Sequence, residues 1–509
     1  MRSNRHDWRV RHRQTTSVAF RSAKERSFAE RNATISATYC CKTRSVNFLI
    51  ATRRVRSNDR GPTHLRIPIC RVVWYSNLTR CEIWIRSTLR RSAWEYFKMR
   101  WIVTSLLGVA LSQGAVTELR AEERPAVAKA TQRIIAGTES KTIARCGAGW
   151  LEEINGYPVL HLKGTPYEMG YQHGALLKES VTANMNRILN TEAGQEMVKI
   201  GPVSLKPRDA IKTIIAIQAK YVPQKYLDEI AGLSAGSGLD PEEAKMANFI
   251  PELFHCSGFA ISGAATKDGT LYHGRVLDYA IDWGLQEHAV IIVAEPNGSI
   301  PFVNVSYAGF VGSVTGMNAE HVAIGEMGGS GLGHWQGVPM AFLLREGLEK
   351  GHTLEDVLSV FRDNPRTCEY YYVVSDAKTN EAVGMEASWD DMNVIKQGEG
   401  HELLPKPVQE CSLLSSGGRY DELVARTKAG YGTFTAETAL TLMDRPVAMN
   451  SNLHNVLFEP KSTKFWVANA GADKTPAADR PYYEFQLSEL LTRHPQSGSK
   501  ELPMVVAGK

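Results

Sequence analysis

The sequence predicts an α+β layered fold, in which β-hairpins pack together and helices gather between them. Apolar, β-compatible runs recur in pairs around short turns, as at Glu295–Gly298. Helical patterns fall between these pairs and do not follow each strand in turn, so a parallel βαβ sheet is not expected. Hydrophobic residues make up 43% of the 509-residue chain, enough for a sizeable core. The length allows two to four domains, or one large α+β unit.

Charge is distributed unevenly along the chain. Residues 1–98 hold 22 Lys and Arg against 6 Asp and Glu, whereas the rest of the chain is acidic. A basic arm for nucleic acid is one reading of this Arg-rich segment. No nucleic-acid module accompanies it, so no nucleic-acid partner is expected. We expect residues 1–98 to be disordered, or to be upstream sequence translated by mistake.

The second interpretation rests on the segment that follows. Residues 99–121 begin with Met99 and Arg100, continue with the apolar run Trp101–Leu111, and end in small and polar residues. This is the anatomy of a secretory signal peptide, and the apolar run is too short to span a bilayer. We therefore expect the native protein to begin at Met99, to be exported to the periplasm or the extracellular space, and to have no stable membrane insertion.

The first part of the body, residues 122–255, is predicted to be mainly helical. A strand is expected at Gly156–Lys163. Thr165 and Glu168 then form a capping box around Pro166, and the glycine-rich helix start suits close packing against a sheet. Within the helix, His173 is interpreted as a packed histidine and not as a base.

Residues 210–253 are also predicted to be mainly helical. Gly232–Gly236 matches the Gly-x-Ser-x-Gly elbow of serine hydrolases. That motif requires a strand before the serine and a helix after it. Here helical spacing precedes Ser234, so we do not assign Ser234 as a nucleophile.

The next stretch, His255–Asp278, contains the candidate chemistry. Phe259–Ser262 and Leu271–Asp278 read as two strands joined by a turn at Lys267–Gly269, which places Cys256 opposite residue 280 or so. Cys256, Arg275 and Asp278 then converge at one end of the hairpin. A nearby cation favours the thiolate, which attacks carbonyl groups. The alternative is a small buried cysteine beside a surface ion pair.

Further strands and helices are expected downstream. Strand pairs are predicted at 289–294 with 300–305, 311–315 with 322–325, 370–374 with 382–385, and 455–458 with 465–468. Helices are predicted at 340–349, from the cap at Thr353 to Arg362, and at 436–443. The glycine-rich Gly328–Gly333 lacks a P-loop lysine and is interpreted as a mobile loop.

The cysteines of the body are spaced without a Cys-x-x-Cys pair. A structural zinc site is therefore not expected, and no cofactor is predicted. Two of Cys146, Cys368 and Cys411 could form a disulfide in an exported protein, although the sequence does not say which two. Cys256 would remain as a free thiol.

Several of these features resemble one known family. A cysteine followed by a hairpin and Gly-Arg-x-x-Asp resembles the N-terminal-nucleophile (Ntn) cysteine hydrolases, and most closely the acyl-coenzyme A:6-aminopenicillanic acid acyltransferase family. The resemblance covers about residues 150 to 490 and implies a four-layer αββα sandwich. The other matching motifs, in chain order, are Gly164–Gly174, Gly316–Asn318 and Ser416–Tyr420.

The resemblance also implies a mechanism. The bond between His255 and Cys256 would be cleaved autocatalytically, and the new α-amine would act as general base beside the thiol. Residues 122–255 would then form the small chain, and 256–509 the catalytic large chain, in one domain. By the same resemblance, Asp278 would orient the α-amine, and Arg275 would stabilise negative charge near the thiol.

Two more roles are implied by the motifs downstream. Asn318 would donate to the oxyanion of the tetrahedral intermediate. Arg419 would place its guanidinium behind the residues that contact the substrate. Bile-acid and penicillin hydrolases of this kind carry a Thr-Asn motif before that arginine, whereas the matching stretch here is Leu413–Ser416. A hydroxyl or a backbone N–H must then serve as the second oxyanion donor.

The functional hypothesis is an Ntn amidohydrolase or acyltransferase that acts on an acylated small molecule. An acyl-CoA, an N-acyl amino acid and a lipid all remain open as substrates, and the oligomeric state is not predicted. One alternative is a phospholipase-B-like hydrolase of lipid esters or amides. Another is a non-catalytic binding protein on an Ntn scaffold.

The proposed start at Met99 predicts which peptides the native protein contains. Mass spectrometry of protein from its native source should find no peptide that maps before Met99. Because a signal peptide acts at the start of a chain, a peptide from residues 1–98 would contradict this start.

Overall fold

The computed structural model describes residues 49–50, 72–76, 79–82, 133–137, 139–192, 198–200, 203–205, 207–250, 256–279, 281–330 and 333–504. The chain divides into two units, Met1–Val116 and Thr117–Lys509. In the first unit, three short antiparallel strands are described: β1 (Leu49–Ile50), β2 (Val72–Ser76) and β3 (Thr79–Glu82). No strand was predicted there from the sequence. The rest of residues 1–98 and the expected signal peptide at 99–121 lie outside the described residues.

The larger of two sheets in the second unit has eleven strands. Their order is β18-β17-β16-β15-β14-β13-β12-β7-β6-β5-β23. The bounds are β5 Ser140–Cys146, β6 Gly149–Ile154, β7 Tyr157–Gly164, β12 Ala289–Pro296, β13 Phe302–Tyr307, β14 Thr315–Asn318, β15 Val322–Ser330, β16 Glu369–Asp376, β17 Glu381–Ser388, β18 Met392–Lys396 and β23 Lys500–Leu502. The strand expected at 156–163 and the pairs at 289–294 with 300–305 and at 370–374 with 382–385 are confirmed as elements of this sheet. The strand expected at 311–315 is shifted, because β14 begins only at Thr315.

The second sheet has seven strands and carries the hairpin that begins after Cys256. Its order is β19-β10-β11-β20-β21-β22-β4. The bounds are β4 Ile134–Ile135, β10 Ser257–Gly263, β11 Gly269–Asp278, β19 Cys411–Leu414, β20 Asn452–Glu459, β21 Lys464–Asn469 and β22 Tyr482–Gln486. A separate pair, β8 (Val198–Ile200) and β9 (Val203–Leu205), completes the described strands of this unit.

Helices cover the outer faces of the two sheets. Those near the larger sheet are α3 Pro166–Leu176, α4 Lys178–Asn186, α5 Pro207–Gln218, α6 Gln224–Ser237, α7 Pro241–Ala247, α8 Met340–Lys350 and α9 Leu354–Asp363; those near the smaller sheet are α10 Gly417–Ala429 and α11 Ala436–Leu440. The chain also forms α12 Leu487–Leu490, a π-turn at Arg187–Glu192, and short 3₁₀ turns at Ile281–Trp283, Leu285–His288, Thr441–Met443 and Ala477–Asp479.

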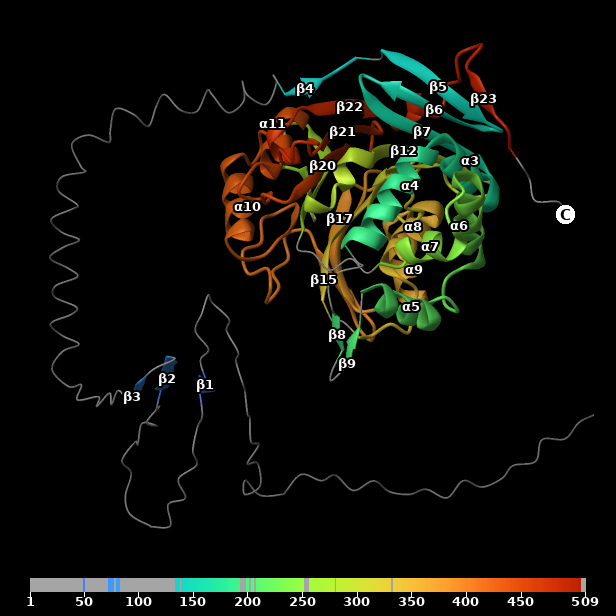
Figure 1. Cartoon of the computed structure of the whole chain (residues 1–509). Coiled ribbons are helices and arrows are strands. Elements are labelled where there is room, and N and C mark those ends of the chain that lie inside the picture. The colour runs from blue at the N-terminus through green and yellow to red at the C-terminus, as the bar shows by residue number, and fades with distance from the viewer. Residues whose placement is uncertain are drawn as a thin grey trace, which may run out of the picture. The chain divides into compact units, whose positions relative to one another are not determined.

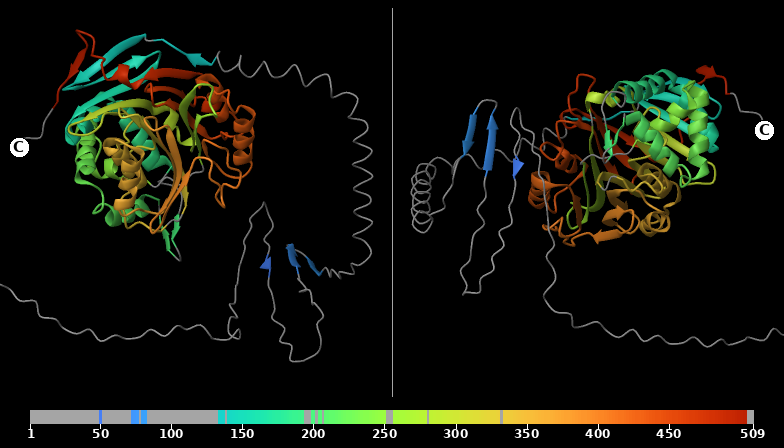
Figure 2. Two further views of the ribbon diagram at one scale, coloured as in Figure 1. Left: turned by 180° about the vertical axis from the view of Figure 1, so that it is seen from behind. Right: turned by 60° about the horizontal axis from the view of Figure 1, so that its bottom comes forward.

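Alternation of side chains along the strands divides the core into layers. Val159 and Ile291 of the larger sheet meet Val456 and Phe465 of the smaller one between the sheets. Neighbouring strand residues such as Leu160 instead face α3, α6 and α8. Figure 1 shows α10 and α11 on the opposite side of the sheets from α3 to α9, and the two views of Figure 2 agree. The predicted α+β, four-layer αββα arrangement is confirmed.

The contact between α3 and α6 depends on four glycines. A Cβ atom added at Gly170 would lie 1.9 Å from the Glu229 carbonyl oxygen, and one at Gly232 would lie 2.1 Å from the Tyr167 carbonyl oxygen. Gly174 and Gly236 repeat this close approach one turn further along. The two glycine motifs of the sequence therefore form a helix–helix contact. The first motif also packs against the larger sheet, as expected: the Gln172 side chain donates to the Lys163 carbonyl oxygen of β7 at 2.8 Å.

The central hairpin forms as predicted but in a different register. Ser257 pairs with Val276 and Gly258 with Arg275, three residues earlier on the second strand than the sequence suggested. The turn lies nearer the start of the predicted one, and the register shifts at a bulge between Ile261 and Gly263. Lys267 N–H of the turn donates to the Phe434 carbonyl oxygen at 3.0 Å, so a distant segment also holds the turn in place.

Other expectations need correction. Residues 122–255 contain the helices α3 to α7, but they also contain β5 to β7, which extend the larger sheet. Gly328 to Ser330 belong to β15 and do not form a loop. Cys146, Cys368 and Cys411 are buried free thiols, so the described residues contain no disulfide.

Two sequence interpretations are confirmed. Ser234 lies inside α6 and donates to the Leu239 carbonyl oxygen, so it is no nucleophile elbow. His173 is buried and accepts from the Gly309 N–H at 3.0 Å. No helix among the described residues is long and apolar enough to cross a membrane.

The glycine contact yields a stability test. Gly170→Ala should lower the free energy of unfolding by about 1–3 kcal/mol or more, because the new Cβ would force the two helix backbones apart. Denaturant titration measures the change. Gly418→Ala in α10 is the matched control: its Cβ would meet nothing within 4 Å, so stability should stay equal or rise. Equal stability of both variants would contradict the helix contact.

Candidate active site

Cys256 lies immediately before β10, at one end of the smaller sheet, and is 4% exposed. Its backbone N–H donates to the Met327 carbonyl oxygen of the larger sheet at 3.3 Å. Burial raises the pKa of the Cys256 thiol to about 12, although the Arg275 guanidinium opposes this rise. In the uncleaved chain the thiol is therefore neutral, and it needs an adjacent base to become a nucleophile.

Arg275 spans the space between the two sheets. It is fully buried on β11, and its Nη2 pairs with Glu326 Oε2 of β15 at 3.1 Å. A side chain at Gly325 would lie 2.7 Å from Arg275 Cγ, so glycine at this position makes room for the guanidinium. Burial raises the pKa of Glu326 above its ordinary value, and the Arg275 guanidinium opposes this rise.

A β-bulge places Glu326 at the site. The register of β15 against β16 shifts between Glu326 and Gly329, and Gly328 has a φ of 105°. Bulges of this kind re-aim side chains next to active sites. Glu326 is not among the site residues that the sequence predicted. The signal was an acidic residue inside an otherwise apolar strand, since buried Glu is rare unless paired.

Asp278 ends β11 and holds a second buried ion pair. Its Oδ2 accepts from Arg419 Nη2 at 2.7 Å, and its Oδ1 accepts from the Met449 N–H at 2.9 Å. Burial raises the pKa of Asp278 to about 6, against the opposing effect of Arg419. Arg419 is held further by a hydrogen bond from Nε to the Val447 carbonyl oxygen at 2.9 Å.

Two serines connect Arg419 to the nucleophile. Arg419 Nη2 also donates to Ser257 Oγ, and Ser257 Oγ lies 2.7 Å from Ser415 Oγ. Ser257 directly follows Cys256, and it is fully buried. The structure therefore brings together four of the predicted residues, Cys256, Arg275, Asp278 and Arg419. His255, the other side of the predicted cleavage bond, lies outside the described residues.

Asn318 does not join this group in the way the sequence predicted. Its side-chain amide donates to the carbonyl oxygens of Leu348 at 3.0 Å and of Gly351 at 2.8 Å. Its Oδ1 accepts from two N–H groups of the following turn, at Glu320 and Val322. One end of the amide is thus committed to the C-terminal end of α8, and the other end to the β14–β15 turn. The interpretation of Asn318 as an oxyanion donor is therefore wrong in this structure.

Cys256 lines a cavity of about 400 Å³, which we call the nucleophile cavity. Apolar side chains form most of its wall, with a few polar groups among them. Its lining residues include Met327, Met385, Ile395, Leu404, Leu414 and Ser415. An apolar cavity with a few polar groups beside a nucleophile suits a substrate that has a hydrocarbon part and one reactive polar bond.

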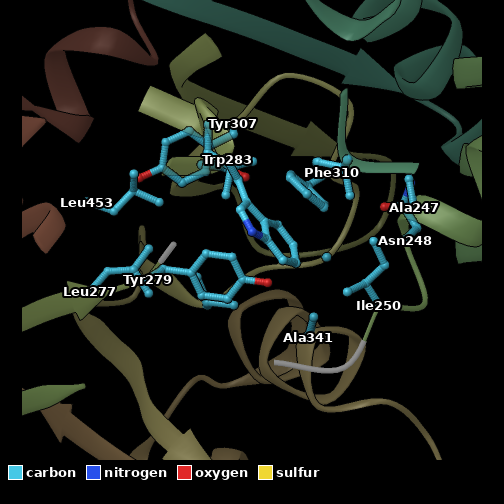
Figure 3. A pocket seen from close by; sticks show the side chains of 15 residues that line it. Ala247, Asn248, Ile250, Leu277, Tyr279, Trp283, Tyr307, Phe310, Ala341 and Leu453 are labelled. Atoms are coloured by element: carbon cyan, nitrogen blue, oxygen red, sulfur yellow. The ribbon is translucent and has the colours of Figure 1, made fainter. Parts of the chain in front are cut away.

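A second, aromatic cavity of about 60 Å³ lies beside the two residues that flank Asp278 at the end of β11. Leu277 and Tyr279 contribute to its wall, as do Trp283, Tyr307 and Phe310. Figure 3 shows the Trp283 ring between these aromatic side chains, and Tyr279 meets Trp283 edge to face at 5.8 Å between ring centroids. This packing fixes the backbone on both sides of Asp278.

No group of three or more potential metal ligands occurs among the described residues. The chemistry available at the site is a thiol, two carboxyl groups, two guanidinium groups and two hydroxyls. These groups suit acyl transfer through a thioester, since a thiol can attack a carbonyl and charged neighbours can stabilise the intermediate.

Comparisons with known proteins bear on this chemistry. A family model described as "Acyl-coenzyme A:6-aminopenicillanic acid acyl-transferase" matches residues 264–403. "N-acylethanolamine-hydrolyzing acid amidase" of Cavia porcellus is 27% identical over 189 residues, which are 35% of this chain and 52% of that protein. The resemblance to the Ntn cysteine acyltransferase and hydrolase group is confirmed.

Other relatives share more of the chain. "Protein dcd1B" of Dictyostelium discoideum is 25% identical over 403 residues, 71% of this chain and 79% of that protein. "Protein dcd1A" of the same organism is 26% identical and is covered over 60% of its length. The chain therefore spans most of the first relative, but only about half of the acid amidase. The match to the acyltransferase family includes Arg275, Asp278 and Glu326, and ends before Arg419.

The raised pKa of Asp278 predicts a pH-dependent stability. A carboxyl group whose pKa is higher in the folded chain than in the unfolded chain binds its proton more tightly when folded. Its contribution to the free energy of unfolding is therefore full below about pH 4 and falls as the pH rises to about 6. In Asp278→Asn, this fall of about 2–3 kcal/mol should be missing.

Denaturant titrations at pH 4, 5, 6 and 7 measure the effect. Asp268→Asn makes the same substitution at the exposed turn of the same hairpin, where hydrogen bonds to Thr270 lower the pKa of Asp268. This control should keep the wild-type fall between pH 4 and 6. A fall of the same size in Asp278→Asn would contradict the assignment to Asp278.

Proposed function

We propose that this protein is an Ntn hydrolase or acyltransferase that cleaves its own chain before Cys256 and uses the Cys256 thiol to take an acyl group from an amide. The observation that carries the proposal is the position of Cys256. It stands at the start of a central strand, with buried Arg275 and Asp278 near its sulfur and a cavity of about 400 Å³ beside it.

Self-cleavage supplies the base that the thiol lacks. In the uncleaved chain the Cys256 nitrogen is an amide, and burial keeps the thiol protonated. Cleavage of the bond to His255 converts that nitrogen into an α-amine, whose ordinary pKa is about 7.7–8.0. The amine can take the thiol proton near neutral pH, so a separate histidine is unnecessary.

Turnover then proceeds in two steps. The thiolate attacks the acyl carbonyl, the carbon–nitrogen bond breaks, and the α-ammonium gives its proton to the leaving amine. Water or an acceptor amine next attacks the thioester, gives a proton to the α-amine, and releases the thiol. Arg275 stabilises negative charge near the sulfur, while Asp278 and Arg419 hold this end of the strand in place.

The nucleophile cavity supports an acyl group of hydrocarbon character. Met327, Met385 and Leu414 form apolar wall next to Cys256, and flexible methionines adapt to chains of different shape. We propose an N-acyl amide or an acyl thioester as the substrate. We also propose that the protein is exported by the signal peptide that begins at Met99.

Processing and nucleophilic activity are tested together. A denaturing gel of the wild type should show two fragments, and Edman sequencing of the larger one should begin at Cys256. Cys256→Ala should stay intact and have no turnover, since both reactions need its sulfur. Cys146→Ala removes another buried free thiol, in β5, and should be processed normally.

Assays on the same preparations determine the substrate class. Processed enzyme is assayed with N-acyl amino acids, simple fatty amides, acyl thioesters and lysophospholipids. Turnover of amides or thioesters supports the proposal, whereas turnover of lysophospholipids alone would favour a lipid-ester hydrolase. An intact wild-type chain without turnover on any of these would favour a binding protein.

A further inference from the structure

The structure leaves one part of the proposed chemistry without a donor. A tetrahedral intermediate on Cys256 carries an oxyanion that must be stabilised, and the amide of Asn318 is committed to the carbonyl oxygens of Leu348 and Gly351. The stretch Leu413–Ser416, which precedes α10 and Arg419, contains no asparagine either. A different donor must face the nucleophile cavity.

We infer that the Ser415 hydroxyl is this oxyanion donor, oriented by a hydrogen-bonded relay that runs from Arg419 through Ser257. The inference rests on the proposed function, since it names a residue that acts on the intermediate formed at Cys256. Ser415 and Cys256 both line the nucleophile cavity. Ser257, which contacts Ser415, is the residue directly after the nucleophile.

The direction of the relay follows from its donors and acceptors. Arg419 has N–H donors and no acceptor, so Ser257 Oγ must accept from Arg419 Nη2. Ser257 is fully buried, and its own proton needs an acceptor. Ser415 Oγ, at 2.7 Å, is the acceptor present among the described residues. Ser257 therefore donates to Ser415, and the Ser415 proton remains available to the cavity.

The relay is held rigidly and is polarised from one end. Among the acceptors that hold Arg419 are Ser257 Oγ, Asp278 Oδ2 at 2.7 Å and the Val447 carbonyl oxygen at 2.9 Å. A cationic donor at the start of a hydrogen-bond chain strengthens the bonds that follow it. The relay therefore makes Ser415 a better donor than an isolated serine, and it sets the direction of its O–H.

The start of α10 adds to the same effect. The helix begins at Gly417, two residues after Ser415, and is 13 residues long. The N-terminus of a helix carries partial positive charge, which favours an anion nearby. Ser415 thus lies between a guanidinium-polarised relay and a positive helix end. Ser415 is the catalytic residue of this group, whereas Ser257 and Arg419 are positioning residues.

Kinetics on mature enzyme test the inference. The probes are octanoyl p-nitroanilide as substrate, octanal as an inhibitor that forms a tetrahedral adduct with the thiol, and iodoacetamide as an alkylating agent. Ser415→Ala should lower kcat about 10²-fold with little change in KM, because a donor to the transition state is lost. The inhibition constant of octanal should weaken with kcat, since the adduct resembles the intermediate.

Alkylation separates this role from a structural one. Iodoacetamide displaces iodide at a carbon and forms no oxyanion, so its rate at Cys256 should stay unchanged in Ser415→Ala. The alkylated fraction also counts mature sites, so slow processing is not mistaken for slow turnover. Ser415→Thr keeps the hydroxyl and should recover most of kcat. Ser257→Ala, which breaks the relay, should lower kcat, and Ser257→Thr should restore it.

Ser412→Ala is the matched control. It removes a serine hydroxyl from β19, three residues before Ser415, and that hydroxyl has no hydrogen-bond partner in the described part of the chain. Its kcat should equal that of the wild type. A wild-type kcat in Ser415→Ala, with normal processing and alkylation, would overturn the inference and leave the proposed function standing. A wild-type protein with neither processing nor alkylation at Cys256 would overturn both.

Discussion

The site depends on an ion pair buried between two sheets. Arg275 from the smaller sheet and Glu326 from the larger sheet are each no more than 1% exposed and meet at 3.1 Å. Charges removed from water are tolerated only when paired, and breaking one partner away leaves a buried charge at high cost. The pair therefore fixes how the sheets lie against each other at the end where Cys256 opens into its cavity.

Small residues around this pair make the approach possible. Gly325 leaves room for the Arg275 side chain, and Gly258 leaves room for Met327, whose carbonyl oxygen accepts from Cys256. The bulge at Glu326 turns its carboxylate toward Arg275. A second ion pair, between Asp278 and Arg419, ties the end of β11 to α10. The ion pairs, the glycines and the bulge thus together set the positions of the few residues around Cys256.

The helices on the larger sheet show the same close packing without charge. The glycines of α3 and α6 let two backbones approach until carbonyl oxygens occupy the space where side chains would be. This contact lies within residues 122–255, the proposed small chain. Strands β5 to β7 of the same segment lie in the larger sheet, with β7 parallel to β12 of the proposed large chain. The two parts therefore share one core, which holds them together after a cut before Cys256.

The sequence by itself determined the layered α+β class, most hairpins, the capped helices and the grouping of Cys256, Arg275 and Asp278. Each of these follows from local patterns, namely period-two alternation, turn residues and caps, which act over a few positions. The tertiary structure decided the hairpin register, the bulge that delivers Glu326, the commitment of Asn318 to a turn, and the serine relay to Ser415. These depend on partners far along the chain, such as Phe434 for the turn and Leu348 for Asn318. A hydrogen bond between distant segments has no period in the sequence, because only folding brings its two ends together.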